Sequence, residues 1–228
     1  ERTRNYEVKT RRFEKFDGNL SGLNLLVLHN LPSRNQNPEA LLKKAADAGV
    51  PVLFILGTSL NVNAFNALQS GLVIQGGSTD RTNAAGPVLD NNFSLFSLSD
   101  VLRGSIASFP PLLAPFGKYK PSGTPYVLLN QQIGAVTSAE PLLFFTENGR
   151  SRRGFLCGEG FWRWPIADYS QNGSWDASQE LLLKTVQFLS ASGNRSNFRV
   201  LARNSYAENE AIILDAEVYD QSYSLVNT

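Results

Sequence analysis

Ser59 is the residue whose position most resembles that of a nucleophile. Pro51 to Leu56 is an apolar run that predicts a buried strand, and Leu60 to Leu68 is an amphipathic stretch that predicts a helix. Between them stands the turn Gly57-Thr58-Ser59, followed closely by Asn61. A sharp strand-to-helix turn can lift one side chain above a sheet, where the helix N-terminus favours a developing anion. The spacing therefore predicts a nucleophile elbow with Ser59 at its tip.

A serine hydroxyl needs a neighbouring base before it can attack an amide, and His29 is the single histidine of the sequence. His29 ends the apolar run from Leu23, where ligand sites of open α/β sheets gather. One hypothesis is thus a triad of Ser59, His29 and Glu159. The alternative is an elbow retained for its packing, with the histidine hydrogen-bonded at a strand end.

A second possible ligand cradle lies further along the chain, in the segment Glu159-Gly160-Phe161-Trp162-Arg163-Trp164. Trp162 and Trp164 flank Arg163 in sequence, so we expect the guanidinium to lie between two indoles in a cation–π arrangement. That arrangement either anchors a loop over the core or, with Glu159, binds a ligand.

The remaining candidate residues point to binding rather than to a metal or a cofactor. Gly76-Gly77 lies in a polar, glycine-rich stretch that predicts a strand at Leu72 to Gln75 and then a long, ligand-binding loop to Gly86. Its glycines lack the strand-turn-helix spacing of a dinucleotide site, so we expect no cofactor. With one cysteine and one histidine we expect no metal site, and Cys157 is predicted to be a buried, unreactive thiol.

The elements that must position these residues indicate an α/β fold. The apolar strand ending at His29, a helix from Pro38 to Ala48 and the strand at 51–56 predict a βαβ crossover and a parallel sheet covered on both faces. A further strand is predicted at 6–10, and the strands predicted at 126–131, 135–137, 142–146 and 153–158 are expected to form a meander. We also expect irregular structure at 93–106 and a helix at 178–190 with Leu181, Leu182, Thr185, Phe188 and Leu189 on one face.

After Gly193 the pattern changes to alternation at Asn197 to Arg203 and Ala211 to Val218, which is typical of antiparallel strands. We therefore expect one α/β domain over residues 1–195 and the opening strands of a truncated β-sandwich over 196–228. The remainder of that sandwich would belong to a longer polypeptide.

Composition excludes several partners. The 228 residues are 42% apolar, and 21 basic against 20 acidic residues leave a net charge of +1, too small for a nucleic-acid-binding field. No apolar stretch approaches 18 residues, so we expect membrane attachment only through flanking segments outside this sequence.

The turn after the second strand resembles the elbow of class I glutamine amidotransferases, which has the pattern glycine, any, cysteine, any, glycine, any, glutamine. Gly57 matches, whereas Ser59, Asn61 and Asn63 replace the cysteine, the second glycine and the glutamine. The family's late histidine is also missing, because no histidine follows His29. The resemblance implies a flavodoxin-like or Rossmann-like parallel sheet from Leu23 to Ser190, without thiolate chemistry.

Cys157-Gly158-Glu159-Gly160-Phe161-Trp162-Arg163-Trp164 also resembles a segment of uncharacterised bacterial proteins anchored in the membrane, in which an amidotransferase-like domain lies on the periplasmic face of the cytoplasmic membrane. Phe109-Pro110-Pro111-Leu112 and Asn130-Gln131-Gln132-Ile133-Gly134 resemble segments of the same family. The resemblance implies that the chain's partners are other domains of its own polypeptide.

Three functional hypotheses follow. The first is a pseudoenzyme that binds a small polar ligand or a protein, with Gly57, Ser59, Asn61, Gly76, Gly77, Glu159, Trp162 and Arg163 as the binding residues. The second is a serine hydrolase or amidase that uses Ser59 with His29. The third is a structural spacer domain.

Overall fold

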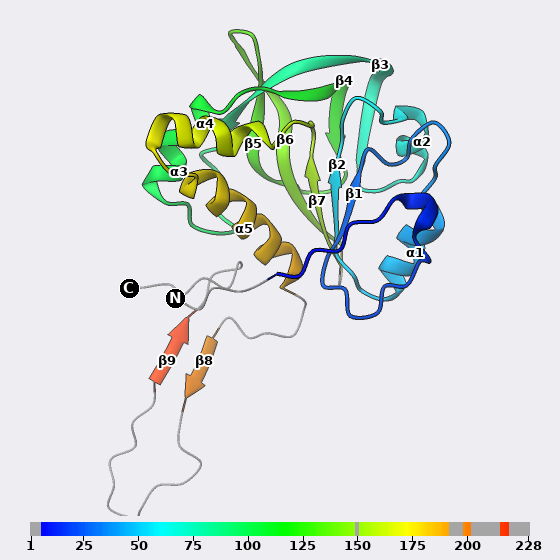
Figure 1. The fold of residues 1–228 in the computed structure, drawn as a ribbon, viewed down its shortest axis with the longest axis horizontal. Helices are drawn as coiled ribbons and strands as arrows, with labels where there is room; N and C mark the ends of the chain where they lie inside the picture. Colours follow the sequence, from blue (N-terminus) through cyan, green and yellow to red (C-terminus); the bar gives the residue numbers. More distant parts are fainter. Residues whose placement is uncertain (1–5, 149–150, 192–197, 202–214, 219–228) are drawn as a thin grey trace, which may run out of the picture.

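The computed structural model describes residues 6–148, 151–191, 198–201 and 215–218, and Figure 1 shows the course of the chain. In chain order the elements are η1 (Phe13–Lys15), β1 (Leu26–His29), α1 (Glu39–Asp47), β2 (Val52–Ile55), α2 (Val62–Ala67), β3 (Leu72–Leu89), α3 (Asp100–Ser105), η2 (Ile106–Ser108), β4 (Leu112–Pro121), β5 (Tyr126–Ile133), β6 (Val136–Asn148), β7 (Ser151–Leu156), α4 (Arg163–Asn172), α5 (Asp176–Ser190), β8 (Phe198–Leu201) and β9 (Asp215–Val218). Strands β1 to β7 form one sheet in the order β1-β2-β7-β6-β5-β3-β4. The α/β class expected from the sequence is confirmed.

The seven-stranded sheet has a parallel part and a larger antiparallel part. β2 pairs in parallel with both β1 and β7, and the four remaining pairs are antiparallel. The β1–α1–β2 crossover is as predicted, but the flavodoxin-like or Rossmann-like parallel sheet expected from Leu23 to Ser190 is not confirmed, because most of the strand pairs are antiparallel. The antiparallel pairing follows from the short connections between strands. Only Gly134 and Ala135 join β5 to β6, and a link of two residues permits only antiparallel neighbours.

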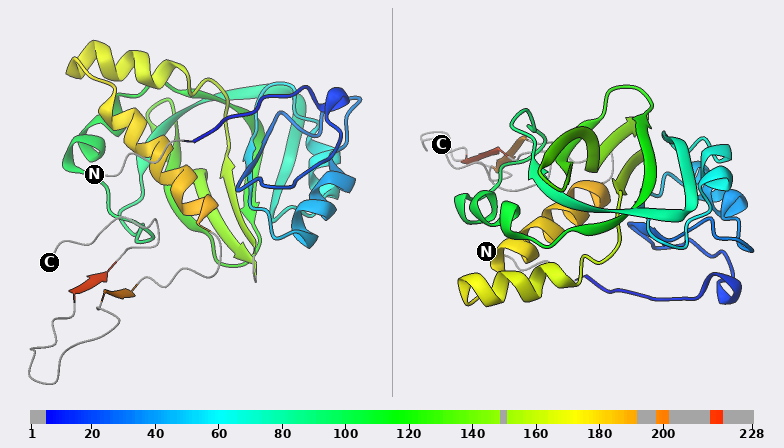
Figure 2. Two further views of the ribbon diagram at one scale, coloured as in Figure 1. Left: turned by 60° about the horizontal axis from the view of Figure 1, so that its bottom comes forward. Right: turned by 90° about the horizontal axis from the view of Figure 1, so that it is seen from above.

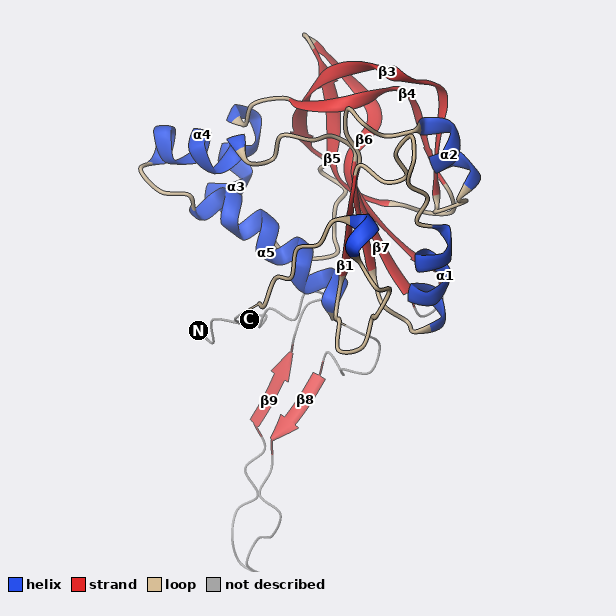
Figure 3. Cartoon of the chain, turned by 45° about the vertical axis from the view of Figure 1, so that its right-hand side comes forward, coloured by secondary structure: helices blue, strands red, loops and turns tan. Residues whose placement is uncertain are grey.

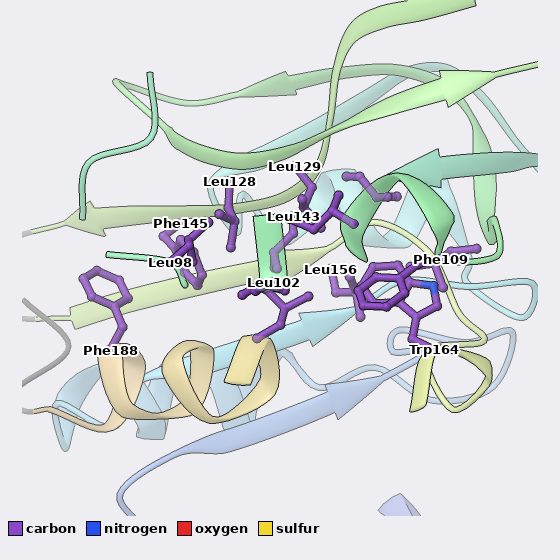
Figure 4. Close-up of a cluster of buried hydrophobic side chains, with 14 of the residues drawn as sticks. Leu98, Leu102, Phe109, Leu128, Leu129, Leu143, Phe145, Leu156, Trp164 and Phe188 are labelled. Carbon is purple, nitrogen blue, oxygen red and sulfur yellow. The ribbon is translucent and has the colours of Figure 1, made fainter. Parts of the chain in front are cut away.

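Helices cover the sheet on two sides, with α1 and α2 on one and α3, α4 and α5 on the other (Figures 2 and 3). Successive residues of the central strands face opposite cores, because side chains alternate along a strand. Phe54 and Phe155 belong to the core beneath α1 and α2, and their rings stack at a centroid distance of 5.1 Å. Their neighbours Leu53 and Leu156 belong to the core beneath α3 and α5, whose labelled members include Leu102, Trp164 and Phe188 (Figure 4).

Strand β3 corrects the predicted glycine-rich loop. It runs unbroken from Leu72 to Leu89, but its pairing with β4 shifts register between Gln75 and Ser78 and again before Thr82. Gly76 has a φ of +63° at the first irregularity, and a β-carbon on Gly77 would lie 2.6 Å from a methyl of Val62. The glycines thus form a bulge packed against α2 rather than a loop. The polar residues of this segment suggested a loop, but they are polar because residues 80–82 of the strand are exposed to solvent.

The antiparallel part bends until its last strand meets the chain beyond β7. Leu113 at the start of β4 exchanges both backbone hydrogen bonds with Glu159, at 2.9 and 3.0 Å. This bridge connects the outer edge of β4 to the segment that follows the central strand β7. It fixes the backbone of Glu159 independently of the parallel strands.

Other differences from the expected elements have local causes. Residues 6–10 are exposed and form no strand, because no neighbouring strand pairs with them. β1 is the other edge of the sheet, and its Val27 is 48% exposed, so this strand is not covered on both faces. Helix α5 is confirmed, although its Leu182 is exposed. The meander is present as β5–β6–β7, but the two strands expected at 135–137 and 142–146 form the single strand β6. Helices α3 and α4 and strand β4 were not expected.

Two of the strands expected after Gly193 are present. β8 and β9 pair antiparallel, Phe198 opposite Val218 and Leu201 opposite Asp215. Most of the predicted β-sandwich segment over 196–228 lies outside the described residues, so the sandwich itself stays a prediction. Among the described residues no helix is long and apolar enough to cross a membrane.

Candidate functional site

The carboxyl ends of the three parallel strands meet at one edge of the sheet. Register pairs His29 of β1 with Ile55 of β2, and Ile55 with Leu156 of β7, so the residues that follow each strand come together. Asn30 follows β1 and Thr58 lies just beyond β2. Glu159 comes soon after β7, and all three side chains meet at this edge.

Glu159 is the centre of this edge. Its Oε1 accepts a hydrogen bond of 2.6 Å from the Thr58 hydroxyl, and its Oε2 accepts one of 2.6 Å from the Asn30 amide. The Glu159 side chain is 21% exposed, and the His29 Nε2 lies 3.7 Å from Oε2. One carboxylate therefore ties together the ends of three strands that are far apart in sequence.

The electrostatics of Glu159 favour its charged form. Partial burial alone would raise the pKa of the carboxyl, but hydrogen bonds from Thr58 and Asn30 and the nearby His29 outweigh it. The pKa of Glu159 consequently lies below its ordinary value, and the group carries a negative charge at neutral pH.

Two backbone features make room for this arrangement. Asn30 has a φ of +54°, a left-handed conformation that asparagine tolerates better than most residues. Gly57 passes directly beside the carboxylate, since a β-carbon there would lie 2.1 Å from Glu159 Oε2 and 2.7 Å from Asn30 Oδ1. Asn30 Oδ1 is buried and has no hydrogen-bond partner among the described residues. Glycine at position 57 is thus required by the placement of the carboxylate.

An open pocket of about 730 Å³ lies against Glu159. Besides Glu159, its lining residues are His29, Ile55, Leu113, Gly160, Phe161, Trp162 and Arg163. Its size is in the range of small-molecule sites, and most of its wall is apolar or aromatic. We call it the Glu159 pocket.

Ser59 lines a different pocket, of about 530 Å³, together with Glu14, Ser33, Arg34, Asn35, Gln36, Thr58 and Asp80. We call it the Ser59 pocket. The Ser59 side chain is exposed, and its hydroxyl makes no hydrogen bond to any described residue. His29 Nε2 faces Glu159 and the Asn30 amide instead. The predicted triad is therefore only half assembled, as a histidine–carboxylate pair.

The predicted elbow differs from the geometry that activates a nucleophile. Thr58 and Ser59 form a turn closed by a 3.2 Å hydrogen bond from the Leu60 amide to the Gly57 carbonyl. Helix α2 begins only at Val62, and Asn61 caps it by accepting from the Ala64 amide at 3.1 Å. Ser59 therefore stands before the helix rather than on its first turn, and Asn61 serves as an N-cap.

Trp162, Arg163 and Trp164 separate instead of stacking, because consecutive residues of the α4 turn point in different directions. Trp162 is 68% exposed at the pocket rim, whereas Trp164 is buried against Phe109 (Figure 4), with a ring-centroid distance of 5.1 Å. Trp164 also donates its Nε1 proton to the Pro110 carbonyl. Arg163 donates to the carbonyls of Pro111 and Gly160. The expected guanidinium between two indoles is wrong.

The other predicted site residues lie apart from the Glu159 pocket. Gly76 and Gly77 belong to the β3 bulge and line neither pocket. Cys157 is fully buried, and burial raises the pKa of its thiol well above the ordinary value, with the nearby Glu140 adding to the shift. The expectation of a buried thiol is confirmed. Among the described residues no group of three or more histidine, cysteine or acidic side chains could hold a metal ion.

Sequence reasoning missed Asn30 and Thr58. A signal was present for both, because each is a polar residue just beyond an apolar strand that was correctly predicted. The helix after the site also had signals: Pro165 fits a first helical turn, and Gly173, with a φ of +69°, ends α4.

Comparisons with known proteins add little. A scan of protein-family models and a search of curated protein sequences give no match. Among solved structures, the chain is similar to the cytoplasmic protein STM3548 from Salmonella typhimurium, with 16% identity, a TM-score of 0.48 and coverage of 76% of each chain. So distant a likeness assigns neither a family nor a function.

Proposed function

We propose that this chain is a non-catalytic binding module whose ligand occupies the Glu159 pocket. The proposal rests on the difference between the hydrogen bonding of the Glu159 carboxylate and that of the Ser59 hydroxyl. Glu159 is held by side chains from two other strand ends and by the backbone of β4, whereas the Ser59 hydroxyl is exposed and unbonded among the described residues. A fixed group beside a pocket is pre-organised for binding, and binding costs less when the site is ordered beforehand.

The assignment to the amidotransferase-like, flavodoxin-like type is part of this proposal. It is supported by the parallel β1–α1–β2 unit and by the turn at Gly57 and Ser59 after β2. The replacement of the elbow cysteine by Ser59 supports the non-catalytic assignment, because a hydroxyl is far less acidic than a thiol.

We also propose that the module belongs to a larger, membrane-anchored protein of the cell envelope, on the periplasmic face. The support is the resemblance carried by Cys157 to Trp164, which contributes Glu159, Trp162 and Arg163 to the pocket. Its protein partners are then other domains of the same polypeptide.

A thermal-shift screen tests the binding function. The full chain is heated with amino acids, amides, amines, sugars and cell-wall fragments, because a ligand that binds only the folded state raises the melting temperature. We expect at least one compound to raise it, and Trp162→Ala to reduce that shift without lowering the melting temperature of the free protein. If no compound shifts the wild-type protein, the binding function is wrong and the structural-spacer hypothesis gains.

The serine hydrolase remains the second candidate because of one observation, the 3.7 Å separation of His29 Nε2 and Glu159 Oε2, which is the histidine–carboxylate half of a triad. A fluorophosphonate probe that labels active serines distinguishes the two. We expect no adduct by intact-protein mass spectrometry. An adduct on the wild-type chain that is lost in Ser59→Ala would establish the hydrolase and overturn the non-catalytic module.

A further inference from the structure

The Glu159 pocket contains a negative charge that is only partly compensated. Each oxygen of the carboxylate accepts one hydrogen bond from a neutral side chain, and the backbone of Thr58 adds a further favourable contact, whereas a carboxylate can accept about four hydrogen bonds. Among the described residues, His29 is the only cationic group within 4 Å, and it is charged only when protonated. The exposed part of Glu159 thus retains both charge and acceptor capacity.

Arg163 lines the same pocket without pairing with Glu159. Its guanidinium donates to the backbone carbonyls of Pro111 and Gly160, which holds it against the start of β4. No ion pair between Arg163 and Glu159 occurs within 4 Å in the described part of the chain. Two of the arginine's five N–H donors bond to these backbone carbonyls, which fixes the guanidinium on the fold, and the carboxylate has no arginine partner within 4 Å among the described residues.

The wall beside the carboxylate suits a cation on an apolar body. Trp162 presents an indole that is 68% exposed at the rim, and Ile55, Leu113 and Phe161 complete an apolar lining. The carboxylate attracts the cation, and the exposed indole offers a flat apolar surface for the body that carries it. Neither group attracts an anion.

We propose, building on the proposed function, that the ligand of the Glu159 pocket is an organic cation: an ammonium group that contacts Glu159, carried on an apolar or aromatic body that packs on Trp162. The open side of the pocket accommodates the substituents that extend beyond this head group. The specificity resides in the charge of the head group, and the apolar wall contributes affinity for any flat body.

Three probes of matched shape test this inference on the full chain: 2-phenylethylamine as the cation, 2-phenylethanol as the neutral analogue and phenylacetate as the anion. Binding is measured by isothermal titration calorimetry at neutral pH. We expect the amine to bind about tenfold more tightly than the alcohol, because the ammonium group gains a partly desolvated ion pair, and phenylacetate to bind most weakly.

Two variants locate the effect. Glu159→Gln is expected to remove the preference for the amine over the alcohol, and Trp162→Ala to weaken both probes to a similar degree. Circular dichroism and the melting temperature establish that each variant is folded, and Glu159→Asp, which keeps the charge, provides a second test if Glu159→Gln unfolds. Retention of part of the preference in Glu159→Asp supports the inference.

The inference is wrong if the alcohol or the acid binds the wild-type chain as tightly as the amine, if Glu159→Gln keeps the preference, or if the amine fails to bind at millimolar concentration. If only the inference of an organic cation fails, the thermal-shift screen is still positive. The compounds that raise the melting temperature are then neutral or anionic, and their effect is reduced in Trp162→Ala. If the proposed binding function fails as a whole, no compound of any charge raises the melting temperature of the wild-type protein.

Discussion

The Glu159 pocket and the Ser59 pocket lie on either side of Thr58, whose hydroxyl bonds to Glu159 and whose surface lines the Ser59 pocket. The first pocket has apolar walls and a carboxylate held by three segments of the chain. The second is lined entirely by polar side chains from the turn after β2, η1, the segment 33–36 and β3, and its serine is exposed and unbonded among the described residues.

This difference teaches that a residue's chemical type does not make a site. By residue type, serine is a more common catalytic nucleophile than glutamate, yet nothing in the described structure activates Ser59. Glutamate is an ordinary surface residue, but here its geometry and charge state are fixed by its surroundings. Four substitutions can break or sharpen the comparison, and the expected effects decrease from the first to the last.

The largest effect is expected from Trp164→Ala, which removes the anchor beneath the rim of the Glu159 pocket. Trp164 is fully buried, stacks on Phe109 and donates to the Pro110 carbonyl. Truncating a large buried aromatic side chain costs about 3–5 kcal/mol of unfolding free energy. Urea denaturation measures the loss. Trp162→Ala is the matched control, and an equal loss there would mean that the two tryptophans are not buried as described.

Gly57→Ala is expected to destabilise the fold by about 1–3 kcal/mol, because the added methyl collides with the Glu159 carboxylate and with Asn30 Oδ1. The same denaturation experiment applies, with ligand binding as a second readout. Gly104→Ala in α3 is the control: a β-carbon there meets no atom within 4 Å, so the change is expected to stabilise the helix by about 0.5–1 kcal/mol. Equal effects of the two substitutions would contradict the close packing at Gly57.

Glu159→Gln is expected to cost about 1–2 kcal/mol at neutral pH, since two charge-assisted hydrogen bonds lose their acceptor charge. The loss must depend on pH. The pKa of Glu159 is lower in the folded than in the unfolded chain, so its contribution is complete above the ordinary value of 4.5 and is lost as pH falls through the lower folded-state pKa.

Denaturation of both proteins between about pH 7 and pH 3 therefore tests the prediction. The stability difference between wild type and Glu159→Gln should be constant down to the ordinary carboxyl pKa and should shrink below it. A difference that grows on acidification would show that the carboxylate is not stabilised in the folded state.

The smallest effect is expected from Ser59→Ala, within about 0.5 kcal/mol of wild type, because the hydroxyl is exposed and makes no bond to a described residue. Thr58→Val, one residue earlier, removes the hydrogen bond to Glu159 Oε1 and is expected to cost about 1 kcal/mol. Ranking the two melting temperatures checks the comparison. A larger loss for Ser59→Ala than for Thr58→Val would place the important contact in the Ser59 pocket instead.

Part of the fold could be predicted because some signals are local. The apolar runs at β1 and β2, the helix between them and the amphipathic helix α5 carry their periodicity in the sequence. β3 and α4 could not be predicted this way. The bulged, exposed middle of β3 resembles a loop in composition, and α4 buries few residues, so its apolar pattern is weak.

For the site, the sequence predicted only the edge of the sheet at which it lies. The carboxyl ends of parallel strands were the expected location, and His29 and Glu159 do meet there. Ser59 was expected to join them because a turn between a strand and a helix suggests an elbow, but the orientation of a turn residue depends on its partners. Asn30 and Thr58 were missed because a hydrogen bond to a residue 129 or 101 positions away leaves no local pattern.

The sequence by itself determined that the chain is an α/β protein with one buried thiol and with polar residues beyond its first strands, since these properties depend on composition and on short-range periodicity. Only the tertiary structure decided which of those polar residues form a site. Strand pairing brings Asn30, Thr58 and Glu159 together, and the Leu113 bridge fixes the glutamate's backbone. Contacts between distant segments are selected by the packing of the whole sheet, which is a property of no single segment.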